Sequence, residues 1–568
     1  MKSETVQLTL CQAGQGVGGR LGNTTELCNP PSLTRATGVN SVVLPNGGQG
    51  GVPLGNMVRG RIDAILYDRV LKMIEAAGQA SRRHKRKLKN LRDNYLLRAI
   101  WQLKIVGYVE KHPWEFSRYQ RTTKRKDRIS FDRDLFCGHV IGSHVDIKRT
   151  SESDSVVFAK VANCGANWVC PVCASKIHAV RADEVQHFVD FIHKNNEMIE
   201  KQFGSPYYKR ARKIVMMTLT ASHTSDMLLD EFGPRISEAL RKLQNSKVFK
   251  RLARENGLYL DDECKIKGYI RASEYTHSYK NGWHKHFHAL LTLYADVDVG
   301  SIEEELKQVW VNSCLAAGIC ADDEQSKHNL HEHGLRLDDA QTGAKAVADY
   351  VAKSGGGNYA VMEIACASNK KGRFVPGETA RDLEHRTPNQ IALDMVLYDN
   401  DLASVSRDRH TLAEYMYHTN GTAQLYWAKG LKALCGVGEL SDEAAVDKHT
   451  EDATAICGLT VPHWHIVCKR IDQKALKEAA KNGIYGVKDY FDTIDIDYEL
   501  PSLLTRDEVD LLTKFENETD DQLTEAESNS AMAILAQLAE YAEQSPKTFQ
   551  GGCSYKKPLP MNNKKSID

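Results

Sequence analysis

Three histidines stand at alternate positions in the stretch GWHKHFHALL, at His284, His286 and His288. Alternate side chains of a β-strand lie on the same face of the sheet, so a strand here presents three imidazoles side by side. Phe287 and Leu291 would then point the other way, into an apolar core. A rigid strand with histidines on one face and apolar anchors on the other is suited to holding a metal ion.

A carboxylate lies in the strand predicted just before the histidines. Glu274 belongs to IKGYIRASEYTH, where Ile270 and Ala272 share its face, and the turn SYKNG joins this strand to the next. A hairpin would bring Glu274 close to the histidines. By ligand chemistry alone, two or three imidazoles and a carboxylate favour zinc or manganese over magnesium. The alternative interpretation is an exposed polar strand face that is rich in histidine.

Cysteines form a second candidate metal site. In CGANWVCPVC, the CPVC half has the two-residue spacing typical of a zinc site. The three cysteines of this stretch are Cys164, Cys170 and Cys173. Cys137 is the first choice for a fourth ligand, with His139 and His178 as alternatives. We predict a structural Zn²⁺ here, and buried free thiols are the competing interpretation.

Strands and helices alternate between about residues 210 and 355, and they would position the histidines. KIVMMTLTAS (213–222) predicts a strand, and PRISEALRKLQNSKVFKRLAREN (234–256) predicts one amphipathic helix. A further helix is predicted over DDAQTGAKAVADYVAKS, ending at the glycines 355–357. The pattern predicts an α+β fold, an antiparallel sheet with helices on its connections.

The order of these motifs resembles that of HUH endonucleases, specifically plasmid rolling-circle replication initiators. The matching stretches are a TLT strand end, GYIRASEYT, GWHKHFHALL and DYVAKS, over roughly residues 160–360, with a fainter similarity in QLYWAKGLKAL. The resemblance implies an HUH nuclease core that nicks and rejoins single-stranded DNA at an origin. It places the metal ligands on His286, His288 and Glu274, and it matches His284 to an extra histidine of many initiators.

The resemblance also implies a nucleophile and a catalytic ion. Tyr350 would attack the DNA, giving a 5′-phosphotyrosine adduct and a free 3′-hydroxyl primer. Lys353 follows one helical turn later, where it could stabilise the phenolate or the phosphate. The implied ion is Mg²⁺ or Mn²⁺. Related initiators often carry a glutamate four residues before the tyrosine, where this chain has Ala346, so the way a round terminates is open.

Two basic runs indicate a nucleic-acid surface, although the net charge of +1 gives no signal for the whole chain. Seven of residues 82–92 are Lys or Arg, and a second run spans 118–128. The predicted DNA-binding residues are Arg82, Arg83, Lys85, Arg86, Lys87, Lys124, Arg125 and Lys126. Aromatic residues between the runs could stack on exposed bases, and these are Trp101, Trp114, Phe116 and Tyr119. A solvated helix face or linker is the alternative for each run.

Composition and motifs divide the chain into six segments. They are a disordered arm (1–60), a basic helical DNA-contacting region (61–130), a Cys-rich zinc segment (131–200), the HUH catalytic core (201–360), an accessory region (361–500) and an acidic and helical C-terminal tail (501–568). The beginning of the chain lacks the apolar segment of a secretory signal, and no window is long and apolar enough for a membrane span. We therefore expect a cytoplasmic protein whose 14 cysteines are mostly free thiols.

The leading hypothesis is a replication initiator that acts on single-stranded and origin DNA, with a host helicase as a further candidate partner. Neither a membrane nor a small-molecule cofactor is expected. An HUH-type transposase is the first alternative. A relaxase fits less well, because its tyrosine usually precedes the histidine motif. A zinc-stabilised DNA-binding regulator without catalysis is the alternative from another class.

Overall fold

The computed structural model describes thirteen stretches of the chain. They are residues 68–70, 93–121, 129–151, 155–203, 211–221, 224–261, 263–339, 364–365, 385–397, 401–451, 453–494, 503–517 and 523–544. All of them belong to one compact unit, Met57–Asp568. The predicted disordered arm lies outside the described residues, and so does the helix predicted over 338–354 except for its first two residues. Asp338 and Asp339 end a β-strand instead of beginning a helix, so the prediction is wrong at these two positions.

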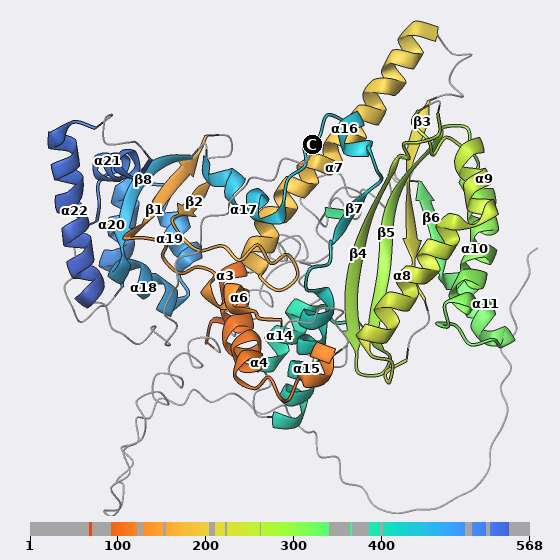
Figure 1. The fold of residues 1–568 in the computed structure, drawn as a ribbon, viewed down its shortest axis with the longest axis horizontal. Coiled ribbons are helices and arrows are strands. Elements are labelled where there is room, and N and C mark those ends of the chain that lie inside the picture. Colours follow the sequence, from red (N-terminus) through yellow and green to blue (C-terminus); the bar gives the residue numbers. More distant parts are fainter. Residues whose placement is uncertain are drawn as a thin grey trace, which may run out of the picture. The chain divides into compact units, whose positions relative to one another are not determined.

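The larger sheet is antiparallel, and its five strands run in the order β6-β3-β5-β4-β7 (Figure 1). The strands are β3 (Arg212–Leu219), β4 (Tyr269–Ser278), β5 (Gly282–Tyr294), β6 (Leu335–Asp339) and β7 (Leu425–Trp427). The two longest, β4 and β5, form the predicted hairpin around the turn at 279–281. The α+β class is confirmed. The edge strand β7 comes from the stretch QLYWAKGLKAL, about 130 residues after the hairpin.

Helices pack against this sheet, and they include α7 (Pro171–Phe203), α8 (Leu229–Asn245), α9 (Lys247–Glu255), α10 (Val299–Ala316) and α11 (Glu324–His333). The prediction of one helix over 234–256 is wrong at Ser246. That residue is extended (φ −61°, ψ 152°), and its hydroxyl accepts a hydrogen bond from the Phe249 amide. Serine is a preferred N-cap, so the chain ends α8 and begins α9 there.

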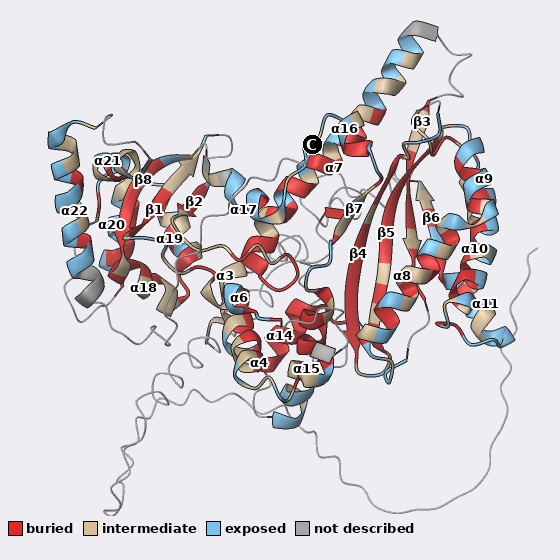
Figure 2. Ribbon diagram, in the orientation of Figure 1, coloured by how far each residue is buried: buried red, intermediate tan, exposed pale blue. Residues whose placement is uncertain are grey.

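The core of this sheet follows the alternation of its strands. Phe287, Ala289 and Leu293 of β5 are at most 5% exposed, and they pack in one cluster with Phe232 and Ile236 of α8. Figure 2 shows β4 and β5 as buried along almost their whole length. The face of β5 that carries Phe287 is therefore the apolar anchor that the sequence predicts.

The smaller sheet has the order β2-β1-β8, with β1 (His144–Thr150), β2 (Val156–Ala159) and β8 (Ala453–Thr460). Its helices are α17 (Asp442–Glu451), α18 (Val461–Arg470), α19 (Gln473–Ala480), α20 (Gly483–Thr493), α21 (Arg506–Asn517) and α22 (Glu525–Gln544). Strand β8 belongs to the predicted accessory region and pairs with β1 from the predicted Cys-rich segment. Leu512 of α21 and Leu538 of α22 are buried beside Ala455 of β8, so the described part of the predicted tail is folded.

A helical layer contains α3 (Asn94–Ile100), the π-helix η1 (Trp101–Val106), α4 (Gly107–Lys111), α5 (Ser117–Arg121), α6 (Asp132–Phe136), α14 (Pro388–Leu397), α15 (Leu402–Thr419) and, near β7, the short α16 (Leu431–Leu434). Three of the aromatic residues predicted to stack on bases lie in its core. Trp101, Phe116 and Tyr119 are at most 2% exposed, whereas Trp114 is 70% exposed. The stacking prediction is therefore wrong for three of the four, because the apolar stripe of these helices packs against α14 and α15. None of the described helices is long and apolar enough to cross a membrane.

Candidate metal centres

The register of the β4–β5 hairpin places a carboxylate against the histidines. Glu274 of β4 lies directly opposite His286 of β5, and the neighbouring pairs are Ala272 with His288 and Thr276 with His284. Side chains of directly paired residues lie on the same face of the sheet. The hairpin therefore gathers Glu274 and the three histidines on one face, as the sequence predicts.

Three of these side chains are close enough to share one ion. The Nε2 atoms of His286 and His288 lie 3.2 and 3.4 Å from Glu274 Oε2, and one ligand atom from each residue lies within 4.8 Å of the others. Two atoms that are each about 2.1 Å from an ion, at angles between about 90° and 109°, are about 3.0–3.4 Å apart. Glu274 and His288 are buried. The donor set and its spacing fit a divalent metal ion.

Threonines of the neighbouring strand β3 hold two of the rings. The Thr218 hydroxyl lies 3.2 Å from His288 Nδ1. When Nδ1 is engaged in this way, Nε2 is the nitrogen that faces Glu274, and such outer contacts orient metal-binding histidines. The Thr220 hydroxyl, just after β3, lies 3.0 Å from His284 Nε2. Trp310 of α10 donates a hydrogen bond of 2.7 Å to the Thr220 carbonyl, which ties this end of β3 to the core.

His284 lies beside the three-residue group without belonging to it. Its ring centroid is 5.1 Å from that of His286, and its Nε2 is directed at Thr220. A further histidine, His385, lies 5.5 Å from His284 between ring centroids, and its φ of 129° is rare for a residue with a side chain. His385 could not be predicted from the sequence, because no spacing pattern links it to the strand.

The other face of β5 is closed by α8. Lys285 lies between the histidines in sequence but points to the reverse side, where its Nζ is 3.2 Å from Ser237 Oγ and 3.4 Å from the Gly233 carbonyl. Burial and the charge of Arg271 lower the pKa of Lys285 from 10.5 to about 7. This reverse face is therefore poorly hydrated, and β5 is fixed on both sides.

The remaining predicted catalytic and DNA-binding residues lie outside the described residues. These are Tyr350, Lys353, Arg82, Arg83, Lys85, Arg86, Lys87, Lys124, Arg125 and Lys126. The structure therefore places the predicted metal ligands, while the roles of the nucleophile and of the basic runs stay predictions.

The four candidate zinc ligands come together in a second group. Cys137, Cys164, Cys170 and Cys173 are all buried, and their sulfur atoms lie within 4.8 Å of one another. Three Sγ–Sγ distances, from Cys137 to Cys170 and to Cys173 and from Cys164 to Cys173, are 3.6 Å. Four sulfurs around a tetrahedral Zn²⁺, each about 2.3 Å from it, are about 3.8 Å apart. The spacing fits zinc and is far from that of a disulfide.

Local structure favours thiolates in this group. Cys170 directly precedes α7 and Cys173 lies in its first turn, where the positive end of the helix dipole stabilises negative charge. Hydrogen bonds from the other three thiols hold the pKa of Cys137 well below its usual range. The contacts with Cys137 raise the pKa of Cys164 and Cys170, so those two thiols would ionise only with a bound cation. The alternative ligands His139 and His178 are outside the group, and burial lowers the pKa of His178 to about 3.

The chain is similar to the protein named "Protein rep" of Streptomyces lividans. The two are 25% identical over 385 residues, which cover 59% of this chain and 79% of the relative. No protein-family model matches the chain. No solved structure matches it either.

Proposed function

We propose that this protein is a plasmid rolling-circle replication initiator of the HUH type, which nicks and rejoins single-stranded origin DNA. The observation that carries the proposal is the group of Glu274, His286 and His288 on one face of a fixed hairpin, with spacing that suits one divalent ion. The similarity to Protein rep supports an initiator over a transposase. The sequence resemblance supports the HUH chemistry.

In this mechanism, Glu274, His286 and His288 would hold a Mg²⁺ or Mn²⁺ ion. The bound ion supplies positive charge that offsets the charge developing on the scissile phosphate and orients that phosphate. The His288 ring is already oriented for binding, because Thr218 engages its Nδ1. The buried reverse face of β5 keeps the strand rigid while DNA is exchanged.

Tyr350 provides the attacking oxygen. Its phenolic oxygen forms a bond to phosphorus while the bond from phosphorus to the 3′ oxygen breaks. The phenol loses its proton and the departing 3′ oxygen gains one, so the products are a 5′-phosphotyrosine and a 3′-hydroxyl. Because the phosphodiester energy is kept in the adduct, rejoining needs no nucleotide hydrolysis. Lys353, three residues after Tyr350 in the sequence, would stabilise the phenolate.

The four cysteines would hold a structural Zn²⁺. A buried tetrathiolate joins the loop at Cys137 and the loop at Cys164 to the first turn of α7, which crosses to the large sheet and contacts β3. Structural zinc contributes directly to folding free energy. The zinc group would therefore stabilise α7, the helix that contacts β3 of the large sheet.

The test is a cleavage assay with a single-stranded oligonucleotide of the origin, labelled on the 3′ side of the nick, and Mn²⁺. The native protein should carry the label on a denaturing gel. Tyr350→Phe should bind metal and DNA but form no adduct, because it lacks only the attacking oxygen. The double variant His286→Ala, His288→Ala should cleave at least about a hundredfold more slowly, because the phosphate charge is no longer offset.

A matched control is Lys285→Met, which changes the residue between the two histidines on the opposite face and should leave cleavage intact. Label on the Tyr350→Phe protein would exclude Tyr350 as sole nucleophile. Full activity of the double histidine variant would show that the histidines form only a polar strand face and hold no catalytic ion. A protein that binds origin DNA but never becomes labelled would be the regulator of the alternative hypothesis.

A further inference from the structure

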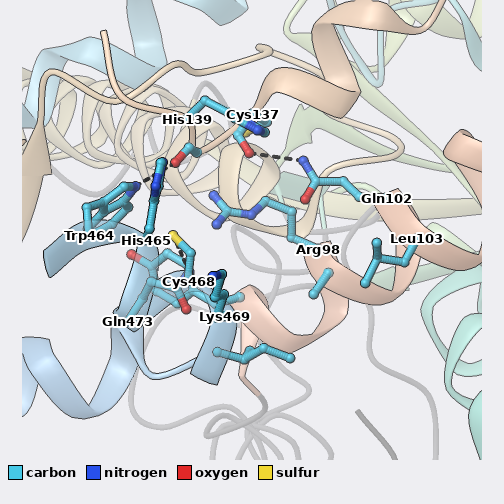
Figure 3. Close-up of a pocket in the computed structure, with 14 residues that line it drawn as sticks. Arg98, Gln102, Leu103, Cys137, His139, Trp464, His465, Cys468, Lys469 and Gln473 are labelled. Atoms are coloured by element: carbon cyan, nitrogen blue, oxygen red, sulfur yellow. Dashed lines mark hydrogen bonds between the residues drawn. The ribbon is translucent and has the colours of Figure 1, made fainter. Parts of the chain in front are cut away.

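A pocket lies next to the cysteine group and includes Cys137 in its lining. Its walls come from α3, from η1, from the loop that follows Cys137, and from α18 and α19 (Figure 3). It encloses about 740 Å³ of space, counting the part open to solvent. Only a small part of that space is enclosed by the protein, so a ligand of nucleotide size would extend from the mouth of the pocket into solvent.

Two buried polar groups of this pocket lack partners. Arg98 of α3 is 7% exposed and reaches from α3 toward the side chains of α18, as Figure 3 shows. Its Nε has no hydrogen-bond partner, and Arg98 forms no ion pair with any carboxylate of the described chain. Gln473 of α19 is 3% exposed; its amide nitrogen donates to Cys468 Sγ, but its Oε1 has no partner. Unpaired buried groups cost free energy, so a donor and an acceptor here point to a missing ligand.

The backbone around the pocket is unusual at three points. Residues Trp101–Val106 form a π-helix, a rare element that often marks functional sites. Ile471 has a φ of 55°, although left-handed backbone is unfavourable for a β-branched residue. Gly138, at φ 90°, leaves space that the Arg98 guanidinium occupies and that a Cβ would fill. All three features shape the wall of the same pocket.

The lining indicates the chemistry of the ligand. Its permanent charges are the cations Arg98 and Lys469, and no Asp or Glu lines it. Burial lowers the pKa of His465 to about 4, so this ring is neutral at pH 7. Tyr95, Trp464 and other apolar side chains supply most of the remaining wall. The pocket therefore suits an anion with an apolar body that can also donate a hydrogen bond.

We propose that this pocket binds one nucleotide, with its phosphate at Arg98 and Lys469 and a base N–H group at Gln473 Oε1. We choose a nucleotide among the anions with an apolar body because of the proposed function. The evidence for the pocket itself does not depend on that function. The nucleotide is either free in solution or one unit of a bound DNA strand. Base readout by an amide oxygen and charge pairing at the phosphate are the usual modes of recognition.

The thiolates of the cysteine group offer a competing account of Arg98. Burial alone would lower the pKa of Arg98, but the nearby Cys137 and Cys170 raise it above its usual range. That attraction explains why a cation is stable beside the sulfurs. It does not explain the unpaired oxygen of Gln473, the apolar walls or Lys469. The experiment therefore uses residues that are not against the cysteine sulfurs.

The test measures binding to the full-length, zinc-containing protein without added Mg²⁺ or Mn²⁺, so that nicking plays no part. Equilibrium dialysis with each of the four deoxynucleoside 5′-monophosphates is one arm, and affinity for a labelled single-stranded oligonucleotide without origin sequence is the other. Lys469→Met should weaken binding on the order of tenfold, as expected for a lost charge-assisted hydrogen bond. The control Lys474→Met removes the same charge from α19 outside the pocket and should change binding less than about twofold.

A second pair of variants uses Leu103, which is 42% exposed at the mouth of the pocket and therefore tolerates polar substitution. Leu103→Glu should weaken binding severalfold, and Leu103→Lys should not.

Loss of binding in the dialysis arm alone identifies a free nucleotide, and loss of binding in the oligonucleotide arm alone identifies a nucleotide of DNA. Equal behaviour of Lys469→Met and Lys474→Met in both arms, or of the two Leu103 variants, overturns the proposal. Adduct formation is assayed separately, so failure of the proposed function remains distinguishable.

Discussion

Replacing Lys285 by methionine tests the two-sided character of the histidine strand. The lysine lies in a buried site on the reverse face of β5, and its pKa falls from 10.5 to about 7. This lowering of the pKa corresponds to about 5 kcal/mol against folding, because the side chain must give up its proton or bury its charge. Methionine has a similar shape and no charge, so Lys285→Met should stabilise the protein at pH 7.

The net gain is smaller than the electrostatic figure. The variant also removes the contacts of Nζ with the Gly233 carbonyl and Ser237 Oγ, and a buried group left unpaired costs about 1–3 kcal/mol. We expect stabilisation of about 2–4 kcal/mol at pH 7. Between pH 7 and 10.5 the unfolded chain holds a proton on Lys285 that the folded chain lacks. The native protein therefore gains stability over this window as the pH rises, and the advantage of the variant disappears near pH 10.5.

The assay is urea denaturation of both proteins at pH 7, 8, 9 and 10, with the slope on denaturant checked for equality. Comparing the two proteins at each pH cancels the titration of all other groups. A difference in unfolding free energy that does not change with pH would refute the reasoning. It would mean that Lys285 keeps its charge in the folded state, so that the reverse face of β5 is hydrated.

Three further predictions concern other parts of the structure. Cys170→Ser should lose one equivalent of zinc and lower the melting temperature, as measured by metal analysis and calorimetry; a native protein purified without zinc would rule the site out. Thr218→Val should weaken Mn²⁺ binding by about tenfold or more by freeing the His288 ring, and an unchanged affinity in a paramagnetic-resonance titration would contradict that role. Trp101→Ala should destabilise the fold by about 3–5 kcal/mol, whereas Trp114→Ala should cost less than about 0.5 kcal/mol in the same urea titration.

The β4–β5 hairpin and its histidine face could be predicted because the information that specifies them is local. Alternation assigns each side chain of β5 to a face, and a short turn sets the register that pairs Glu274 with His286. Edge strand β7 and the neighbour His385 come from distant segments, and no local pattern encodes such long-range pairing. Phe116 is predicted to stack on bases but is buried in the core. That prediction fails because aromatic residues near basic runs suit a core as well as a DNA surface.

The cysteine group shows what the spacing of residues in the sequence can and cannot predict. The CPVC stretch indicates a zinc-type turn, but the fourth ligand is a matter of tertiary structure, because Cys137 lies 33 residues before Cys170. The hydrogen bonds of Gln102 to the carbonyls of residues 134, 135 and 137 hold the Cys137 loop against η1. The loop position therefore depends on a helix outside the Cys-rich segment, which sequence spacing cannot report.

The two candidate metal groups differ in chemistry, and that difference would set how firmly each group holds its ion. Four thiolates prefer soft or borderline ions such as Zn²⁺, and buried closed coordination slows their release. Two imidazoles and Glu274 leave coordination positions open for a phosphate, and their carboxylate oxygen accepts Mg²⁺ or Mn²⁺. Zn²⁺ would also bind the second group more tightly than Mn²⁺ by the usual order of affinities, so the working ion there depends on supply rather than on selectivity. A mild chelator should accordingly abolish cleavage while zinc stays on the cysteines, and Mn²⁺ alone should restore it.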